Sequence, residues 1–141
     1  MKTVAIHQPN FLPWLGFFHK WLSADTLVIL DRVQLVRRTY LTRVDILEQG
    51  RKGTIHVPVV HTGSQSISID EARIDLSQWR PEKVMSRLQH AYGKAPFWSE
   101  LAAPLSEHLH APHSHLLHLN LDLLNLIDTH SLGHLVGKYT H

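Results

Sequence analysis

The stretch IHQPNFLPWLGFF, residues 6–18, decides the fold because it joins a predicted strand to a predicted helix. The short apolar run over residues 3–6 indicates a buried strand. Apolar residues then recur at helical spacing over residues 14–24, and a second apolar run at 26–30 predicts another buried strand. Strand, helix and strand in this order form a βαβ unit, whose crossover is expected to be right-handed. The sequence therefore predicts two parallel strands at the start of an α/β fold.

Polar side chains follow both predicted strands. His7, Gln8 and Asn10 come directly after the first strand, and Asp31 follows the second. Because open α/β sheets bind ligands beyond the carboxyl ends of parallel strands, we expect these groups to face one ligand-binding edge. His7 is a candidate general base because imidazole titrates near neutral pH, and Asp31 could orient it. The alternative is structural: the loop side chains bond only to backbone, and Asp31 serves as a turn or capping residue.

The first turn of the predicted helix carries two further candidates. Trp14 could stack on a base or a sugar, whereas aromatic residues at helical spacing usually pack in the core. Gly16 lies inside the helix at a cost of about 1 kcal/mol relative to alanine. Either another group approaches the backbone closely at Gly16, or the helix simply tolerates it.

Basic residues concentrate between residues 32 and 52, which indicates a local anionic partner. Arg37, Arg38 and Arg43 are the candidates to hold a phosphate, since a guanidinium group can donate two parallel hydrogen bonds to it. A solvated basic loop is the alternative interpretation of the same segment.

Composition narrows the class of protein. The chain has 141 residues, of which 43% are hydrophobic and 18% charged, as in an ordinary globular protein. The net charge of +2 is too small to argue for a nucleic-acid partner, and the absence of cysteine excludes disulfides and thiolate chemistry. The sequence offers no signal peptide and no apolar run long enough to span a membrane. We therefore expect a cytoplasmic location.

Downstream of residue 40 the pattern changes to a hairpin and then to helices. Alternation over residues 43–47 and 54–60, with a polar turn at 48–53, predicts a β-hairpin, and residues 66–70 predict a short strand. Helices are expected from Pro81, from Pro96 and from Ser114. A period-two pattern over residues 117–123 competes with the last helix, but the length of the apolar segment favours the helix.

We thus predict one α/β domain over residues 1–141, with a mostly parallel sheet, an inserted β-hairpin and C-terminal helices. Its parts are an N-terminal βαβ region, a hairpin region and a helical region, at residues 1–35, 40–75 and 79–137 respectively.

Thirteen histidines are the compositional oddity, and five lie close together: His108, His110, His113, His115 and His118. His115 and His118 are three residues apart, a spacing that can place two metal ligands on one helix face. Spacing fixes no third ligand, so we expect adventitious metal affinity and assign neither a functional metal site nor a cofactor.

Several of these segments together resemble the WbqC-like family of bacterial surface-polysaccharide (O-antigen) biosynthesis proteins. They are residues 7–16 (HQPNFLPWLG), 28–34 (VILDRVQ), 37–43 (RRTYLTR), 56–59 (HVPV), Trp79 and 92–98 (YGKAPFW). The chain has Thr42 where the family usually has asparagine. The glycine- and tyrosine-containing part that ends family members is not found, so we expect a short or truncated member.

The resemblance implies an enzyme, a transferase that uses a nucleotide-activated sugar or another phosphorylated intermediate. His7 would be the base, with Asp31 supporting it. Gln8 and Asn10 would position the substrate, and Arg43 would bind phosphate. One alternative is a non-catalytic binding or assembly subunit of the same pathway.

A second alternative is a nucleotide-binding protein similar to nucleotidyltransferases with a His-x-Gly-His motif. The two signature histidines are absent, and Trp14 and Phe17 stand near the positions where they would fall. We also expect self-association through apolar surface around Leu123, Leu126 and Ile127, left uncovered by a missing C-terminal part.

Overall fold

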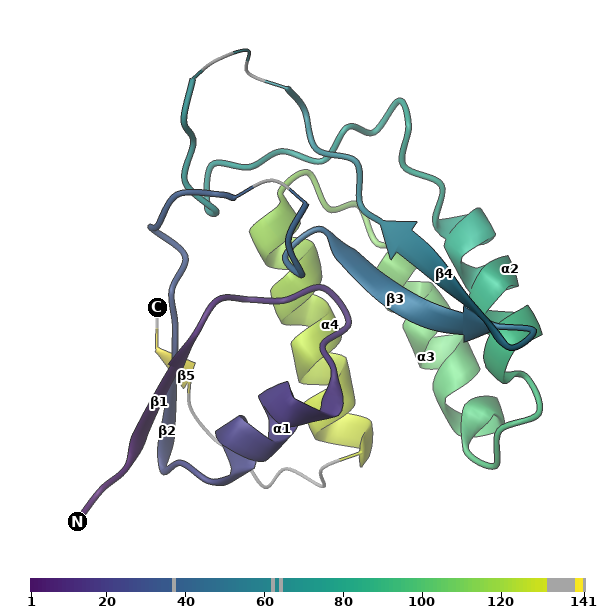
Figure 1. The fold of residues 1–141 in the computed structure, drawn as a ribbon, viewed down its shortest axis with the longest axis horizontal. Helices are drawn as coiled ribbons and strands as arrows, with labels where there is room; N and C mark the ends of the chain where they lie inside the picture. The colour runs from purple at the N-terminus through teal and green to yellow at the C-terminus, as the bar shows by residue number, and fades with distance from the viewer. Residues whose placement is uncertain (37, 62, 64, 132–138, 141) are drawn as a thin grey trace.

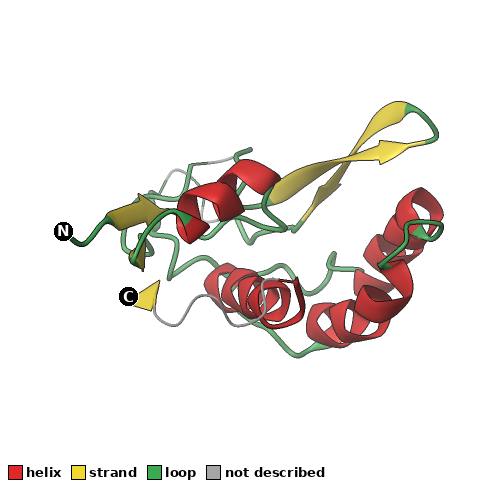
Figure 2. Ribbon diagram, turned by 90° about the horizontal axis from the view of Figure 1, so that it is seen from below, coloured by secondary structure: helices red, strands yellow, loops and turns green. Residues whose placement is uncertain are grey.

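The computed structural model describes residues 1–36, 38–61, 63, 65–131 and 139–140. Its elements are β1 (Val4–His7), α1 (Leu15–Leu22), β2 (Thr26–Ile29), β3 (Arg43–Glu48), β4 (Arg51–His56), α2 (Pro81–Tyr92), α3 (Trp98–His110), α4 (Leu116–Ser131) and β5 (Tyr139–Thr140) (Figure 1). The sheet, α1 and the hairpin form one layer, and α2, α3 and α4 form the other (Figure 2). The predicted mixed α/β class is confirmed.

The predicted βαβ unit is present. Strands β1 and β2 are parallel, with Val4 opposite Thr26 and His7 opposite Ile29. Strand β5, which the sequence did not predict, pairs in parallel with the other edge of β2. Phe17, Phe18 and Trp21 of α1 are buried against one face of this sheet, as helical spacing predicts.

The hairpin is tighter than predicted. Strands β3 and β4 pair from Arg43↔His56 to Glu48↔Arg51, so the turn is Gln49–Gly50 and not the six residues expected. Both turn residues have positive φ, 50° and 77°, the signature of a two-residue type I′ turn. The second strand stops at His56 instead of reaching residue 60, because Pro58 has no N–H for the ladder.

The strand expected at residues 66–70 is wrong as a regular element. Only an isolated bridge joins Ser68 to Gln34, with Leu35 N–H donating to the Ile67 carbonyl oxygen at 2.9 Å. This bridge aligns the segment antiparallel to residues 33–35, but the pairing is too short to form a sheet strand.

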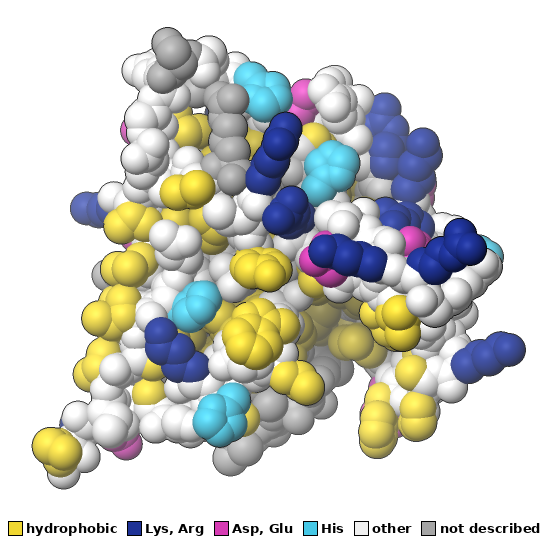
Figure 3. All heavy atoms as spheres, in the orientation of Figure 1, with side chains coloured by type: hydrophobic (Ala, Val, Ile, Leu, Met, Phe, Trp, Pro, Cys, Tyr) yellow, Lys and Arg dark blue, Asp and Glu magenta, His cyan; other side chains and the backbone are white. Residues whose placement is uncertain are grey.

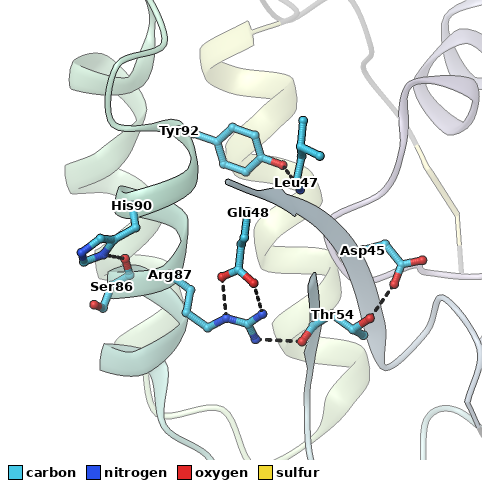
Figure 4. Close-up of polar contacts among 8 residues, drawn as sticks. All are labelled: Asp45, Leu47, Glu48, Thr54, Ser86, Arg87, His90 and Tyr92. Carbon is cyan, nitrogen blue, oxygen red and sulfur yellow. Dashed lines mark hydrogen bonds and ion pairs between the residues drawn. The ribbon is translucent and has the colours of Figure 1, made fainter. Parts of the chain in front are cut away.

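Helix α2 holds the hairpin through polar contacts shown in Figure 4. Arg87 Nε and Nη2 donate to the two carboxylate oxygens of Glu48 at 2.8 and 2.6 Å, and Nη1 donates to the Thr54 carbonyl oxygen at 2.8 Å. The Leu47 N–H donates to the Tyr92 hydroxyl at 3.2 Å. A side chain at Gly53 would overlap the Glu48 carboxylate, so glycine there allows the ion pair to form.

Helix α4 lies at the centre of the molecule and serves two hydrophobic cores (Figure 1). Leu119, Leu123 and Leu126 pack with the hairpin and with α2 and α3, whereas Leu124 packs with α1 and the sheet. The helical interpretation of residues 117–123 is therefore confirmed. The expected uncovered surface on this helix is wrong, because Leu123 and Leu126 are buried within the chain and Ile127 is half-buried.

Among the described helices, none combines the length and the hydropathy needed to cross a bilayer.

Candidate functional site: a cationic groove beside an aromatic hollow

A groove of about 850 Å³ opens beside the hairpin, and we call it the cationic groove. Its walls come from the start of β3, from β4, and from the irregular segments before and after the hairpin. Its polar lining residues are Gln34, Arg38, Thr42, Arg43, Thr54, His56, His61, Gln65, Ser66, Asp75 and Gln78. On the face shown in Figure 3, Lys, Arg and His side chains gather over the upper half and the hairpin.

The charge of the groove is set by Arg38 and Arg43. Both side chains are exposed, and neither forms an ion pair with any residue that the structure describes, unlike Arg87. Arg38 has a φ of 59°, a backbone conformation that non-glycine residues rarely adopt and that is often found at functional sites. Two guanidinium groups thus belong to the lining of this cavity, and the charge of Arg43 also helps to lower the pKa of the nearby Asp45 carboxyl.

Asp75 is the acidic side chain in the lining, and neighbouring side chains donate hydrogen bonds to its carboxylate. The carboxylate accepts hydrogen bonds from Ser77 Oγ at 2.5 Å and Gln78 Nε2 at 2.8 Å. These bonds, first that from the Ser77 hydroxyl, lower the pKa of Asp75. One carboxylate therefore faces two guanidinium groups, and the balance in the groove favours an anion.

A second cavity, of about 440 Å³, lies between the loop after β1 and the segment that leads into β3, and we call it the aromatic hollow. Its lining residues are Asn10, Phe11, Leu12, Pro13, Trp14, Tyr40, Val44 and Asp45. Trp14 and Tyr40 are 65% and 57% exposed, so neither is a core residue. The two cavities share one wall, because Thr42 and Arg43 line the groove while Tyr40 and Val44 line the hollow.

Gly16 explains the position of Trp14. A β-carbon built on Gly16 would overlap the six-membered ring of the Trp14 indole, so the ring lies directly over the glycine backbone. Close approach, and not tolerance alone, accounts for a glycine inside α1. The indole is thereby held at the N-terminus of the helix, although most of its surface is open to solvent.

A buried asparagine that sequence reasoning missed joins the two loops of the hollow. Asn120 of α4 is fully buried, and its Nδ2 donates to the Pro9 carbonyl oxygen at 2.7 Å and to the Leu41 carbonyl oxygen at 2.9 Å. The Phe11 N–H donates to the Tyr40 carbonyl oxygen at 2.9 Å. The available signal was a single asparagine on the apolar stripe of a leucine-rich helix, where a buried amide must find partners.

Asn10 contributes a side-chain amide to the lining of the hollow. Its side chain is only 5% exposed, yet its amide makes no hydrogen bond within the described part of the chain. Its amide oxygen and nitrogen are not among the fully buried polar atoms that lack a partner, so the amide keeps contact with solvent. The amide therefore remains available to a ligand in the hollow.

His7 is the last residue of β1 and not the first after it, and Asp31 follows the parallel neighbour β2, but neither lines the cationic groove or the aromatic hollow. His7 Nδ1 lies 2.8 Å from the Gln8 carbonyl oxygen and its ring packs edge-on against Phe17 at 4.8 Å. A carbonyl only accepts, so Nδ1 carries a proton and Nε2 is the basic nitrogen of the neutral ring. The Asp31 carbonyl oxygen accepts from Asp70 N–H at 3.0 Å.

The predicted site residues are thus divided among three places. Arg38 and Arg43 line the groove, Asn10 and Trp14 line the hollow, and the remaining described candidates lie at the edge of the sheet: His7, Gln8 and Asp31. Arg37 lies outside the described residues. Sequence reasoning missed His56 and His61 in the groove, although the pairing of His56 with Arg43 follows from a correctly aligned hairpin.

The histidine-rich segment connects helices α3 and α4. His108 Nδ1 and His113 Nε2 lie 2.7 and 3.1 Å from the same carboxylate oxygen of Asp122, and the rings of His115 and His118 are 5.5 Å apart. Within the described residues no group of three or more such side chains is arranged as metal ligands would be. These contacts give His108 and His113 a structural role between the two helices.

Comparison with known proteins agrees with the motifs. The sequence profile of the WbqC-like protein family matches residues 8–132. The chain is also 34% identical over 130 residues to the uncharacterized protein Rv1507c of Mycobacterium tuberculosis, a match that covers 90% of this chain and 55% of the relative. The chain thus spans about half the length of that relative. No solved structure matches the chain. The profile match covers most of the chain, including the loop, the hairpin and the helices, and the chain therefore belongs to the WbqC-like family.

Proposed function

We propose that the cationic groove binds the phosphate groups of a nucleotide-linked or otherwise phosphorylated small molecule, used in bacterial surface-polysaccharide biosynthesis. The observation that carries this proposal is the pair of exposed guanidinium groups, Arg38 and Arg43, which face one cavity without an ion-pair partner among the described residues. Guanidinium matches phosphate through two parallel hydrogen bonds, and each charged hydrogen bond contributes about 1.5–3 kcal/mol.

Neighbouring groups complete the phosphate site in this proposal. His56 pairs with Arg43 across the hairpin, and Thr54 follows on the same side of β4. The Arg87–Glu48 ion pair holds the hairpin against α2, which keeps the wall that carries Arg43 in one position. A positioned donor set binds an anion better than a mobile one, because less conformational entropy is lost on binding.

As part of the same proposal, the protein is a transferase with His7 as general base through Nε2. Gln8 and Asn10 position the substrate, and Asp31 supports the histidine. The support is that His7 ends β1 and Asp31 follows its parallel neighbour β2, at the edge where α/β proteins commonly bind ligands.

One observation favours the alternative of a non-catalytic binding or assembly subunit: His7 lines neither of the two cavities. The two functions separate in a single assay. In a transferase, His7→Ala lowers turnover by about 10²-fold or more, the usual scale for the loss of a general base. In a binding subunit, the same variant supports the pathway at the wild-type rate.

The phosphate site is tested by calorimetric titration of the full chain with inorganic pyrophosphate. Arg43→Gln should weaken binding by about tenfold or more, since at least one charged hydrogen bond is lost. Arg51→Gln is the matched control, because Arg51 belongs to the same hairpin but does not line the groove. Equal losses in both variants would mean that general charge and not this site attracts the anion.

A further inference from the structure

We propose that the aromatic hollow is a nucleobase site, in which a planar base stacks on Trp14 and its polar edge bonds to the Asn10 amide. This inference rests on the proposed function in one respect only: the phosphates of the same ligand occupy the adjoining cationic groove. It assigns the ligand class and gives Trp14, Gly16, Asn10, Tyr40 and Asn120 their roles.

The first step is the stacking surface. The Trp14 indole is 65% exposed, yet one side of its six-membered ring lies over the Gly16 backbone. The ring therefore presents its other side to the solvent from a defined position. Tyr40, 57% exposed, adds a second aromatic side chain to the lining. Bases stack well on such rings because every base has two apolar π faces.

The second step is the polar group. Asn10 is buried to 5% exposure without a hydrogen bond in the described part of the chain, and it lines the hollow. A side-chain amide offers one acceptor and two donors side by side. This pattern matches the edge of a base, where donors and acceptors alternate. A bound base could thus replace the solvent at an amide that has no hydrogen-bond partner in the described part of the chain.

The small number of polar groups in the lining favours a base over a sugar ring. The acidic side chain in the lining is Asp45, and each of its carboxylate oxygens already has one partner within the chain. Oδ1 accepts from Thr54 Oγ1 at 2.8 Å, and Oδ2 pairs with Lys52 Nζ at 2.8 Å. A sugar would bring several hydroxyl groups into a lining that is otherwise apolar or aromatic, and unsatisfied hydroxyls are costly. A base has one polar edge and needs few partners.

The fourth step connects the hollow to the phosphate groove. Arg43 lines the groove and Val44 lines the hollow, so consecutive residues at the start of β3 form a wall of each cavity. Asn120 ties this segment at Leu41 to the loop at Pro9 with two hydrogen bonds. The walls of the hollow are therefore fixed to each other before a ligand arrives, and the groove begins one residue away.

The experiment is calorimetric titration of the full chain with UDP, dTDP, ADP and GDP, with inorganic pyrophosphate and uridine as partial ligands and methyl α-glucoside as the sugar probe. We expect at least one nucleoside diphosphate to bind about 5- to 150-fold more tightly than pyrophosphate, the range that one stacked base contributes. Trp14→Ala should remove this difference and leave pyrophosphate affinity unchanged.

Two further variants distinguish a binding role from a structural one. In Gly16→Ala the new methyl group displaces the indole without removing it, so nucleotide affinity should fall towards that of pyrophosphate while the thermal unfolding midpoint is maintained. Trp79→Phe is the control, because Trp79 is half-buried and lines neither cavity. It should keep the wild-type preference for nucleotides.

The outcomes are separable. Tight pyrophosphate binding without any preference for nucleotides, or an equal loss of both ligands in Trp14→Ala, overturns the base site and leaves the phosphate groove intact. Uridine binding that depends on Trp14, without pyrophosphate binding, supports the base site and refutes the phosphate groove. Binding of methyl α-glucoside that depends on Trp14, without uridine binding, shows a sugar site instead. No binding of any probe at millimolar concentration refutes both proposals.

Discussion

Asn120 should be the most sensitive polar position in the chain, because one buried amide group holds two separate loops. Its Nδ2 donates to the carbonyl oxygens of Pro9 and Leu41, residues 111 and 79 positions away in the sequence. Replacement by leucine keeps a side chain of similar size but removes both donors. We therefore predict that Asn120→Leu destabilises the protein through these two carbonyl groups and not through a loss of volume.

The magnitude follows from the burial of these groups. A carbonyl that loses its partner in the interior costs about 1–3 kcal/mol, so two give about 2–6 kcal/mol. Added apolar burial from leucine offsets part of this, as does removal of the buried Asn120 Oδ1, which accepts no hydrogen bond from the described residues. Partial access of water to the two loops offsets more. We expect a fall in the free energy of unfolding of about 2–4 kcal/mol. Asn120→Asp should cost more, because it places carboxylate oxygens against two carbonyl oxygens.

The assay is equilibrium urea unfolding followed by circular dichroism, with Thr129→Ala as the control on the exposed side of the same helix. That control should lie within about 0.5 kcal/mol of the wild type. A loss below about 1 kcal/mol in Asn120→Leu would refute the reasoning, since two unsatisfied carbonyls could not then be buried there. The nucleotide affinity of Asn120→Leu should also fall, because the walls of the hollow are no longer tied together.

Three further predictions concern the hairpin. The Arg87 hydrogen bonds lower the pKa of Glu48, so the ionised carboxylate stabilises the fold at pH values above the ordinary carboxyl pKa of about 4.3. This contribution is lost as the pH falls through the lowered pKa. In urea unfolding at several pH values, the stability difference between wild type and Glu48→Gln should be largest near neutrality and vanish in acid. Gln49→Asn should raise stability by about 0.5–1 kcal/mol, since asparagine tolerates the positive φ of a type I′ turn, and an unchanged urea midpoint would count against that turn. Gly53→Ala should displace the Glu48 carboxylate from Arg87, so a double-mutant cycle should show Glu48→Gln costing little once the methyl group is present.

The βαβ unit and the helices could be predicted because their signals are local. Apolar runs at residues 3–6 and 26–30 flank a helical stripe, and the resulting strands pair in parallel with the expected adjacency. The turn at Gln49–Gly50 was missed because it depends on positive φ at a glutamine, which side-chain type does not indicate. Strand β5 was missed because two residues carry no periodicity.

The sequence indicated which types of residue belong to the candidate site, but not which of them lie together in one cavity. Arg43 and Trp14 were selected for phosphate and for stacking, and the structure puts them in cavities that share a wall. His7 and Asn10 were expected together because both follow the first predicted strand, yet of the two only Asn10 lines the groove or the hollow. Grouping depends on long-range contacts such as Asn120 to Pro9, and no local pattern encodes a contact between residues 111 positions apart.

The start of β3 lines both cavities. Side chains alternate along a strand, so consecutive residues there can serve different cavities without any loop between them. Arg43 gives the groove a charge and Val44 gives the hollow an apolar wall. The backbone of this segment is fixed on both sides, by Asn120 at Leu41 and by the Arg87–Glu48 pair at the far end of the strand. A ligand with phosphates and a base would contact the groove through Arg43 and the hollow through Val44. Because these residues are consecutive, a movement of this segment would change both cavities together. For that reason Arg43→Gln and Trp14→Ala should each weaken a nucleoside diphosphate while leaving the unfolding midpoint unchanged.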